Sequence, residues 1–159
     1  MKKNSPDIVI TTDGFRYMDE VMRLNKLVFN ESRLINRMDH EPLLFLTAHS
    51  GDALAGFKIG YALNRSVFYS AKGAIHPLHR RKQIATHLLY RMMEEATGLG
   101  FIEFQYDTFP ARYPGMLILG LKHKFKIIQA IWNPEFNDFQ VRLSRTLNHI
   151  HKAHYPEQL

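Results

Sequence analysis

The fold is decided by one stretch, Ile75-His76-Pro77-Leu78-His79-Arg80-Arg81-Lys82-Gln83-Ile84-Ala85-Thr86, which covers residues 75–86. A strand-like run ends there at Pro77, and a helical pattern begins just beyond it. A loop that enters a helix exposes backbone N–H groups without partners and the positive end of the helix dipole. Such a helix start suits a pyrophosphate. Arg80, Arg81 and Lys82 add positive charge at the same point.

Outward from this stretch, the apolar pattern changes its period on the two sides. Downstream, residues 80–99 are expected to form the longest helix, with an apolar stripe from Ile84 to Ala96 and an end at Gly98 and Gly100. Upstream, residues 43–49, 55–63 and 67–75 have strand length and strand composition, and turn residues separate them. These three strands are expected to form an antiparallel meander.

The rest of the chain adds a first strand and helix, and a second half that mixes both types of element. Asp13 is expected to cap the first helix, and residues 30–41 are read as a short helix or a structured loop. The other expected strands are 7–11, 101–108, 125–132 and 136–143, with a short helix at 116–123. The order predicts an α/β fold, a mixed sheet flanked by helices. We expect one domain over residues 1–147 and a tail over 148–159.

Composition limits the classes of function. The chain has 159 residues, is 45% hydrophobic and contains no cysteine, which excludes disulfides and thiolate metal sites and suits a cytoplasmic protein. Its net charge is +6, but the basic residues are scattered, which favours an anionic cofactor over nucleic acid. No apolar run is long enough for a membrane span. The histidines match no compact ligand spacing, so no metal site is expected. A homodimer is left open.

Several short motifs resemble those of the GNAT superfamily of N-acetyltransferases. In that family a strand ending in hydrophobic-x-Pro-x-x-Arg leads into Arg/Gln-x-x-Gly-x-Gly/Ala at a helix start, and Arg80-x-x-Gln83-x-Ala85 occupies those positions here. The matching segments are Gly56-Phe57-Lys58-Ile59-Gly60-Tyr61, Phe68-Tyr69-Ser70 with Gly73-Ala74-Ile75, Met116-Leu117-x-Leu119-x-x-Lys122-x-x-Phe125, and Val141 to Leu147. Three positions depart from the family pattern: Gln83 and Lys124 replace glycines, and Gly120 replaces an asparagine.

The resemblance implies an acetyl-CoA-dependent transferase whose sheet is splayed between its fourth and fifth strands. The pantetheine arm would pair there with backbone groups of Ala74, Ile75 and His76. The phosphates would lie at the helix start, on Arg80, Arg81, Lys82, Gln83, Ile84, Ala85 and Thr86. The implied reaction is direct attack of a primary amine on the acetyl thioester. A catalytically degenerate module that binds acyl-CoA is the alternative, because no tyrosine stands in 116–123 where many members place a general acid.

The catalytic candidates are Tyr69 and Glu103. Tyr69 lies on the strand that leads to the expected pantetheine site, as a proton donor or a substrate contact, although a packing role in the sheet is also open. Glu103 and Asp107 stand at even spacing on one expected strand and so share a face. A carboxylate on that face would deprotonate an ammonium substrate if it lined the cleft. The amine substrate and the acyl chain are not specified by any motif.

Overall fold

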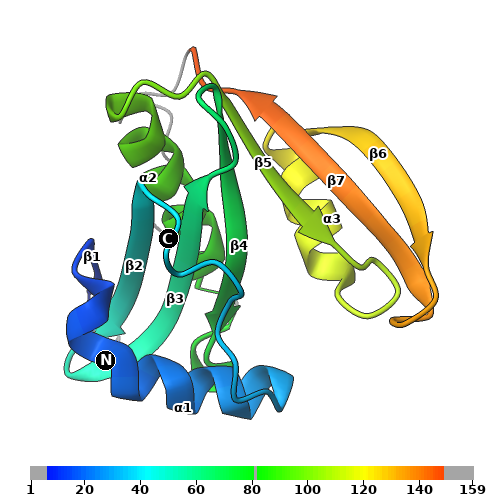
Figure 1. Ribbon diagram of the computed structural model, residues 1–159. Helices are drawn as coiled ribbons and strands as arrows, with labels where there is room; N and C mark the ends of the chain where they lie inside the picture. The colour runs from blue at the N-terminus through cyan, green and yellow to red at the C-terminus, as the bar shows by residue number, and fades with distance from the viewer. Residues whose placement is uncertain (1–6, 81, 149–159) are drawn as a thin grey trace.

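The structure is a computed structural model that describes residues 7–80 and 82–148. It contains one mixed seven-stranded sheet with the strand order β1-β2-β3-β4-β5-β7-β6 (Figure 1). In chain order the elements are β1 (Ile8–Thr11), η1 (Gly14–Tyr17), α1 (Met18–Phe29), β2 (Leu43–Ser50), β3 (Ala53–Ala62), β4 (Val67–Ile75), η2 (Pro77–His79), α2 (Ile84–Gly98), β5 (Glu103–Thr108), α3 (Pro114–Lys122), β6 (Lys126–Asn133) and β7 (Asp138–Thr146).

The sheet divides into two arms. β2, β3 and β4 form the antiparallel meander that the sequence predicts, and β5, β7 and β6 pair antiparallel in the second arm. The arms meet where β4 runs parallel to β5, and this pairing covers only Val67–Ser70 against Glu103–Tyr106. Beyond Ser70 the two strands diverge and leave a V-shaped opening (Figure 1). The expected splay between the fourth and fifth strands is therefore confirmed.

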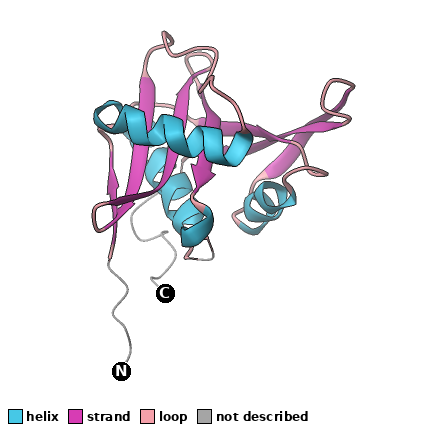
Figure 2. Ribbon diagram, turned by 90° about the horizontal axis from the view of Figure 1, so that it is seen from below, coloured by secondary structure: helices cyan, strands magenta, loops and turns pink. Residues whose placement is uncertain are grey.

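Helices cover both faces of the sheet. α1 lies on one face, and α2 and α3 lie on the other (Figure 2). Phe57 and Phe68 mark the two layers, since Phe57 packs with the buried side chains of α1 and Phe68 with those of α2. The apolar stripe predicted for residues 84–96 is the buried face of α2. Burial of this layer is the main source of the stability of the fold.

Two local expectations are corrected, and one alternative is decided. α2 begins at Ile84 and not at Arg80, because Pro77 opens a 3-10 turn and Arg80 is extended. Asp13 makes no capping hydrogen bond, since the 3-10 turn η1 separates it from α1. For residues 30–41 the sequence leaves a short helix or a structured loop open, and the structure has the loop. Of the expected tail 148–159, all but Asn148 lies outside the described residues.

Candidate active site

The open edge of β4 is the first part of the candidate site. Ala71 to Ile75 continue past the last pair with β5, and within the described residues no strand borders them on that side. Gly73 is exposed, and Ala74 is buried. An unpaired strand edge offers alternating N–H and C=O groups to an extended ligand. Both backbone groups of His76 are engaged, its N–H with Ala55 O at 2.8 Å and its C=O with His79 N at 2.8 Å.

The start of α2 follows directly after this edge. Gln83 is the N-cap residue, and its side chain makes no capping hydrogen bond. No acidic residue lies in the first turn. The first ladder bond runs from His87 N to Gln83 O at 3.0 Å, so the N–H groups of Ile84, Ala85 and Thr86 lie outside the helix's own ladder. The predicted anion site therefore has free donors at its centre.

Gln83 has a left-handed backbone, with φ 56° and ψ 22°. This is the region that glycine enters without steric cost. The side chain of Gln83 is exposed, so it lies toward solvent. Arg80 is also exposed and Lys82 is half-buried, while Arg81 lies outside the described residues. Gln83 thus holds a backbone conformation that favours glycine.

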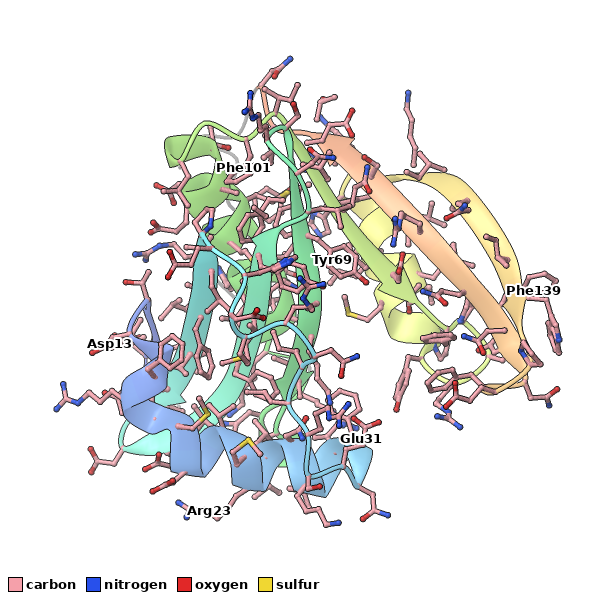
Figure 3. All side chains as sticks on the ribbon, in the orientation of Figure 1. Asp13, Arg23, Glu31, Tyr69, Phe101 and Phe139 are labelled. Atoms are coloured by element: carbon pink, nitrogen blue, oxygen red, sulfur yellow. The ribbon has the colours of Figure 1, made fainter. Side chains whose placement is uncertain are left out.

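A polar cluster lies on the α1 side of the V, where β4 and β5 part. Its centre is Asp107, which receives four hydrogen bonds. Tyr69 Oη donates to Asp107 Oδ2 at 3.0 Å and Gln140 Nε2 to the same oxygen at 2.9 Å. Arg142 donates through Nε to Oδ1 at 2.8 Å and through Nη2 to Oδ2 at 3.0 Å. Figure 3 shows Tyr69 in the V between β4 and β5.

These contacts set the charge states of the cluster. Burial opposes ionisation of Asp107, but the hydrogen bonds from Arg142, Gln140 and Tyr69 outweigh it and lower the pKa of the carboxyl group. Burial and the neighbouring Asp107 carboxylate raise the pKa of Tyr69. The hydrogen bond to Asp107 raises the pKa of Arg142. At neutral pH the cluster is therefore a neutral tyrosine held by a carboxylate–guanidinium pair.

Glu103 stands at the other end of β5. It pairs with Val67 and Thr146, and its Oε2 accepts hydrogen bonds from Gln105 Nε2 at 3.2 Å and from Ser144 Oγ at 3.5 Å. Its catalytic role stays a prediction. Tyr69 is joined instead to Asp107, which sequence reasoning placed on the same face but did not select. The signal for Asp107 was its place near the end of β5, at the mouth of the splay.

A wall on the α1 side borders this cluster. Lys72 of β4 forms an ion pair with Glu31 at 2.6 Å and donates to Arg33 O at 3.3 Å. Phe29 at the end of α1 contacts Tyr113 from the second arm, with ring centroids 5.9 Å apart. The loop after α1 is thus fastened to β4, and the C-terminus of α1 reaches across the V.

Two hollows lie away from this site. One of about 630 Å³ is lined by residues that include Tyr90, Lys126 and Thr146, beside the closed end of the V, where Thr146 pairs with Glu103. Another of about 440 Å³ lies at the turn after β3. A long, extended ligand with a phosphate group would bind along the open strand edge and at the free N–H groups, and it would need no enclosed cavity. These two features therefore define the candidate site better than either hollow.

Among the described residues, no three acidic or histidine side chains gather as metal ligands. Within the same residues, no helix has the length and apolar character to cross a bilayer.

A sheet split between parallel fourth and fifth strands, with an uncapped helix start behind the fourth, defines the acyl-CoA N-acyltransferase fold. The family model of the GNAT acetyltransferases matches residues 11–113. The chain belongs to the GNAT acetyltransferase family.

Solved structures agree in fold at low sequence identity. Ard1 from Thermoplasma volcanium is 13% identical with a TM-score of 0.77, over 87% of this chain and 97% of that chain. An aminoglycoside 6'-N-acetyltransferase in complex with coenzyme A is 15% identical with a TM-score of 0.72, over the same shares. IAA acetyltransferase from Bacillus cereus ATCC 14579 is 17% identical with a TM-score of 0.74, over 88% and 99%. No curated protein matches the sequence.

Proposed function

We propose that the protein is an N-acetyltransferase that moves the acetyl group of acetyl-CoA to a primary amine by direct attack. The observation that carries this proposal is the open edge of β4 leading into the free N–H groups of α2. The strand edge would bind the pantetheine arm at Ala74 and Ile75. Ile84, Ala85 and Thr86 would receive the pyrophosphate, with Arg80, Arg81 and Lys82 as surrounding charge. Gln83 would contribute only its backbone.

The polar cluster supports a role on the acceptor side. Tyr69 donates a hydrogen bond to Asp107, so the lone pairs of its oxygen remain to accept a hydrogen bond from the attacking amine. When the amine attacks the thioester carbonyl, its proton passes to Tyr69 while the phenolic proton moves toward Asp107. Asp107 and Arg142 would act as positioning residues, because they hold Tyr69 and need not touch the substrate.

The acceptor is a small amine or a peptide amine in this proposal. The acceptor side is bordered by the loop after α1 and by the contact between Phe29 and Tyr113. Because three structural neighbours are aminoglycoside 6'-acetyltransferases, aminoglycosides belong in the first panel. The chain carries no cysteine, and we place the enzyme in the cytoplasm.

The test measures free CoA thiol released from acetyl-CoA with a panel of polyamines, aminoglycosides, amino acids and peptides. Amine-dependent release that falls strongly in a Tyr69→Phe variant is the expected result. A second measurement is the shift of the thermal midpoint with acetyl-CoA, because a ligand of the folded state raises it. A shift without turnover would favour the degenerate acyl-CoA-binding module. No shift with any acyl-CoA would refute the cofactor site itself.

A further inference from the structure

Lys58 is a buried lysine without a partner. It lies in the middle of β3, is 6% exposed, and makes no hydrogen bond or ion pair within the described residues. Buried lysines are rare unless paired, because burial of an ammonium group is costly. Burial alone lowers the pKa of Lys58 to about 8, which agrees with the lack of a charged neighbour. The burial of Lys58 without a partner among the described residues therefore needs an explanation.

The position of Lys58 connects it to the open edge of β4. Its cross-strand partners are Leu46 and Gly73, so it faces the α2 side of the sheet, where Leu46 packs. A Cβ built on Gly73 would meet Lys58 Cγ at 3.5 Å. The stem of Lys58 therefore lies next to the exposed Gly73, in the part of β4 whose far edge is unpaired.

The surroundings of Lys58 along β3 are apolar. Gly56 and Gly60 stand two residues away on either side and lie close under α2. A Cβ on Gly56 would meet Leu88 Cδ1 at 3.5 Å, and a Cβ on Gly60 would meet Met92 Sδ at 3.0 Å. Atoms of β4 come closer still, Ile75 Cδ1 at 2.7 Å from the Cβ on Gly56 and Phe68 Cε1 at 2.6 Å from the Cβ on Gly60, so Lys58 lies in a tightly packed layer between β3, β4 and α2.

Two titratable side chains of the same layer, Tyr106 and Tyr90, are engaged elsewhere. Tyr106 of β5 donates to a backbone carbonyl of α3 at 2.8 Å. Tyr90 of α2 is bonded to His123 at 3.0 Å and receives a hydrogen bond from Arg145 at 3.2 Å. Burial is the sole cause of the lowered pKa of Lys58, so no charged side chain of the described residues acts on it.

We propose that Lys58 donates the proton to the thiolate that leaves when an acyl thioester is attacked at the open edge of β4. The inference rests on the proposed acyl transfer. The amine nitrogen forms a bond to the carbonyl carbon, the C–S bond breaks, and the sulfur takes the proton from the Lys58 ammonium group. Water then returns a proton to Lys58. An acid with a pKa of about 8 is well matched to a thiol, whose pKa is about 8.5.

The experiment compares wild type with Lys58→Met, which keeps the length of the stem and removes the amine. We expect the thermal midpoint to be unchanged or raised, acetyl-CoA binding to be retained, and kcat to fall by about 100-fold or more. In the wild type kcat should decline as the pH rises through about 8, because Lys58 loses the proton it donates. The variant should lack this decline.

Each other outcome overturns the proposal in a distinguishable way. A Lys58→Met enzyme with kcat within about twofold of wild type refutes the donor role and leaves the acyltransferase intact. Acetylation of Lys58 itself, detected by mass spectrometry after incubation with acetyl-CoA, would make it a nucleophile and not a donor. A wild type that releases no thiol with any amine refutes the proposed function and this inference together.

A second inference rests on the opposite arm of the sheet. β6 is the last strand of the order, and all residues from Lys126 to Trp132 are exposed. Its large apolar side chains are about half exposed: Ile127 50%, Ile128 54%, Ile131 55% and Trp132 50%. Phe139 of β7, also 50% exposed, packs edge-on against Trp132 with centroids 5.3 Å apart. We call these five side chains the β6 patch.

The β6 patch lacks the usual protection of an edge strand. Monomeric proteins blunt such edges with charges, prolines or covering segments. β6 contains a single charged residue, Lys126, at its first position and no proline. Half of each large side chain amounts to roughly 100 Å², so the five together expose about 500 Å², divided between the two faces of the sheet because Ile131 and Trp132 are adjacent in the strand. A standard interface buries about 800 Å² per partner, and backbone and flanking atoms would add the remainder.

We infer that β6 pairs antiparallel with β6 of a second copy of this chain around a two-fold axis. A two-fold interface needs one self-complementary surface, and an unpaired strand edge is self-complementary in its backbone groups. The antiparallel direction places the two Lys126 side chains at opposite ends of the joint, which avoids a clash of like charge. The V and its open edge of β4 lie on the other side of β5 and β7 and stay accessible.

The test is the molar mass in solution, measured by light scattering over a dilution series. Wild type should be a dimer, and Ile131→Lys should be a monomer with an unchanged thermal shift by acetyl-CoA. Leu27→Lys is the matched control, because Leu27 is 59% exposed on α1, and it should remain a dimer. A monomeric wild type, or an Ile131→Lys variant that stays dimeric, would overturn the inference.

Discussion

Replacing Gln83 with glycine tests the backbone of the proposed phosphate loop. Gln83 holds φ 56°, and Lys124 holds φ 66° at the end of α3. Both are left-handed, and both stand where the family pattern has glycine. Gln83→Gly relieves the local strain at the helix start, whereas Lys124→Gly relieves the same kind of strain away from the open edge of β4. The two variants therefore form a matched pair.

The magnitude follows from two opposing effects. A residue with a Cβ in the left-handed region costs about 1–2 kcal/mol, and glycine removes that cost. Glycine also gives the unfolded chain more freedom, which offsets about 0.5–1 kcal/mol of the gain. We expect each variant to raise the free energy of unfolding by about 0–1.5 kcal/mol. For a chain of this length a gain of about 1 kcal/mol raises the midpoint by roughly 2–4 °C.

The assay combines denaturant unfolding with titration of CoA. Gln83→Gly keeps every N–H donor at the helix start, and the side chain that it removes lies toward solvent. Affinity for CoA should therefore change by less than about threefold, or about 0.6 kcal/mol, in both variants. If Gln83→Gly lowered stability by more than about 1 kcal/mol, the left-handed backbone would carry no strain to relieve. If it abolished CoA binding while Lys124→Gly did not, the glutamine side chain itself would be a ligand.

Three further predictions concern other parts of the fold. Gly120→Ala should destabilise the protein by about 1–3 kcal/mol in denaturant unfolding, because the new Cβ would collide with Tyr106 Oη. Gly115→Ala in the same helix is the control. Its Cβ meets nothing within 4 Å, so this variant should be neutral or stabilising in the same assay. Asp107→Asn should cost about 1.5–3 kcal/mol, since Arg142 loses its charged partner. The pKa of Asp107 is lowered by folding. The stability that the carboxylate contributes is therefore present above the unfolded pKa of about 3.9 and is lost as the pH falls through the lower folded pKa. On acidification the thermal midpoint of wild type should approach that of Asp107→Asn, and a constant difference between the two midpoints would contradict the assignment.

Most of the strands and helices can be predicted from the sequence. Alternating apolar runs before Pro77 and a 3.6-residue stripe after it predict strands and a helix by burial alone, and the predicted bounds of β4 are the observed ones. The predicted helix start is wrong because a basic run such as Arg80 to Lys82 is compatible with both a helix and a turn. A 3-10 turn at Pro77 and a left-handed Gln83 decide between them, and neither has a periodic signal.

Side-chain pairing across the sheet is much less accessible from the sequence. Glu103 and Asp107 share a face by spacing, but only the register decides which of them meets Tyr69. β4 and β5 part after Ser70 and Tyr106, and this places Asp107 beside the mouth of the V with Arg142 opposite. Such pairings join segments more than 30 residues apart, for which a local pattern carries no information.

The three departures from the family pattern, at Gln83, Lys124 and Gly120, can each be explained by the local backbone or by its close neighbours. At Gln83 and Lys124 the conformation of a glycine persists without the glycine, so the path of the chain is kept although the residue is not. At Gly120 the opposite holds, because the hydroxyl group of Tyr106 occupies the space that a side chain at 120 would need and donates to a backbone carbonyl of α3 instead. The polar group at this point of α3 therefore comes from β5. The α2 side of the V then retains Lys58 as a buried amine without a partner among the described residues, which is why a change at Lys58 should affect thiol departure rather than the fold.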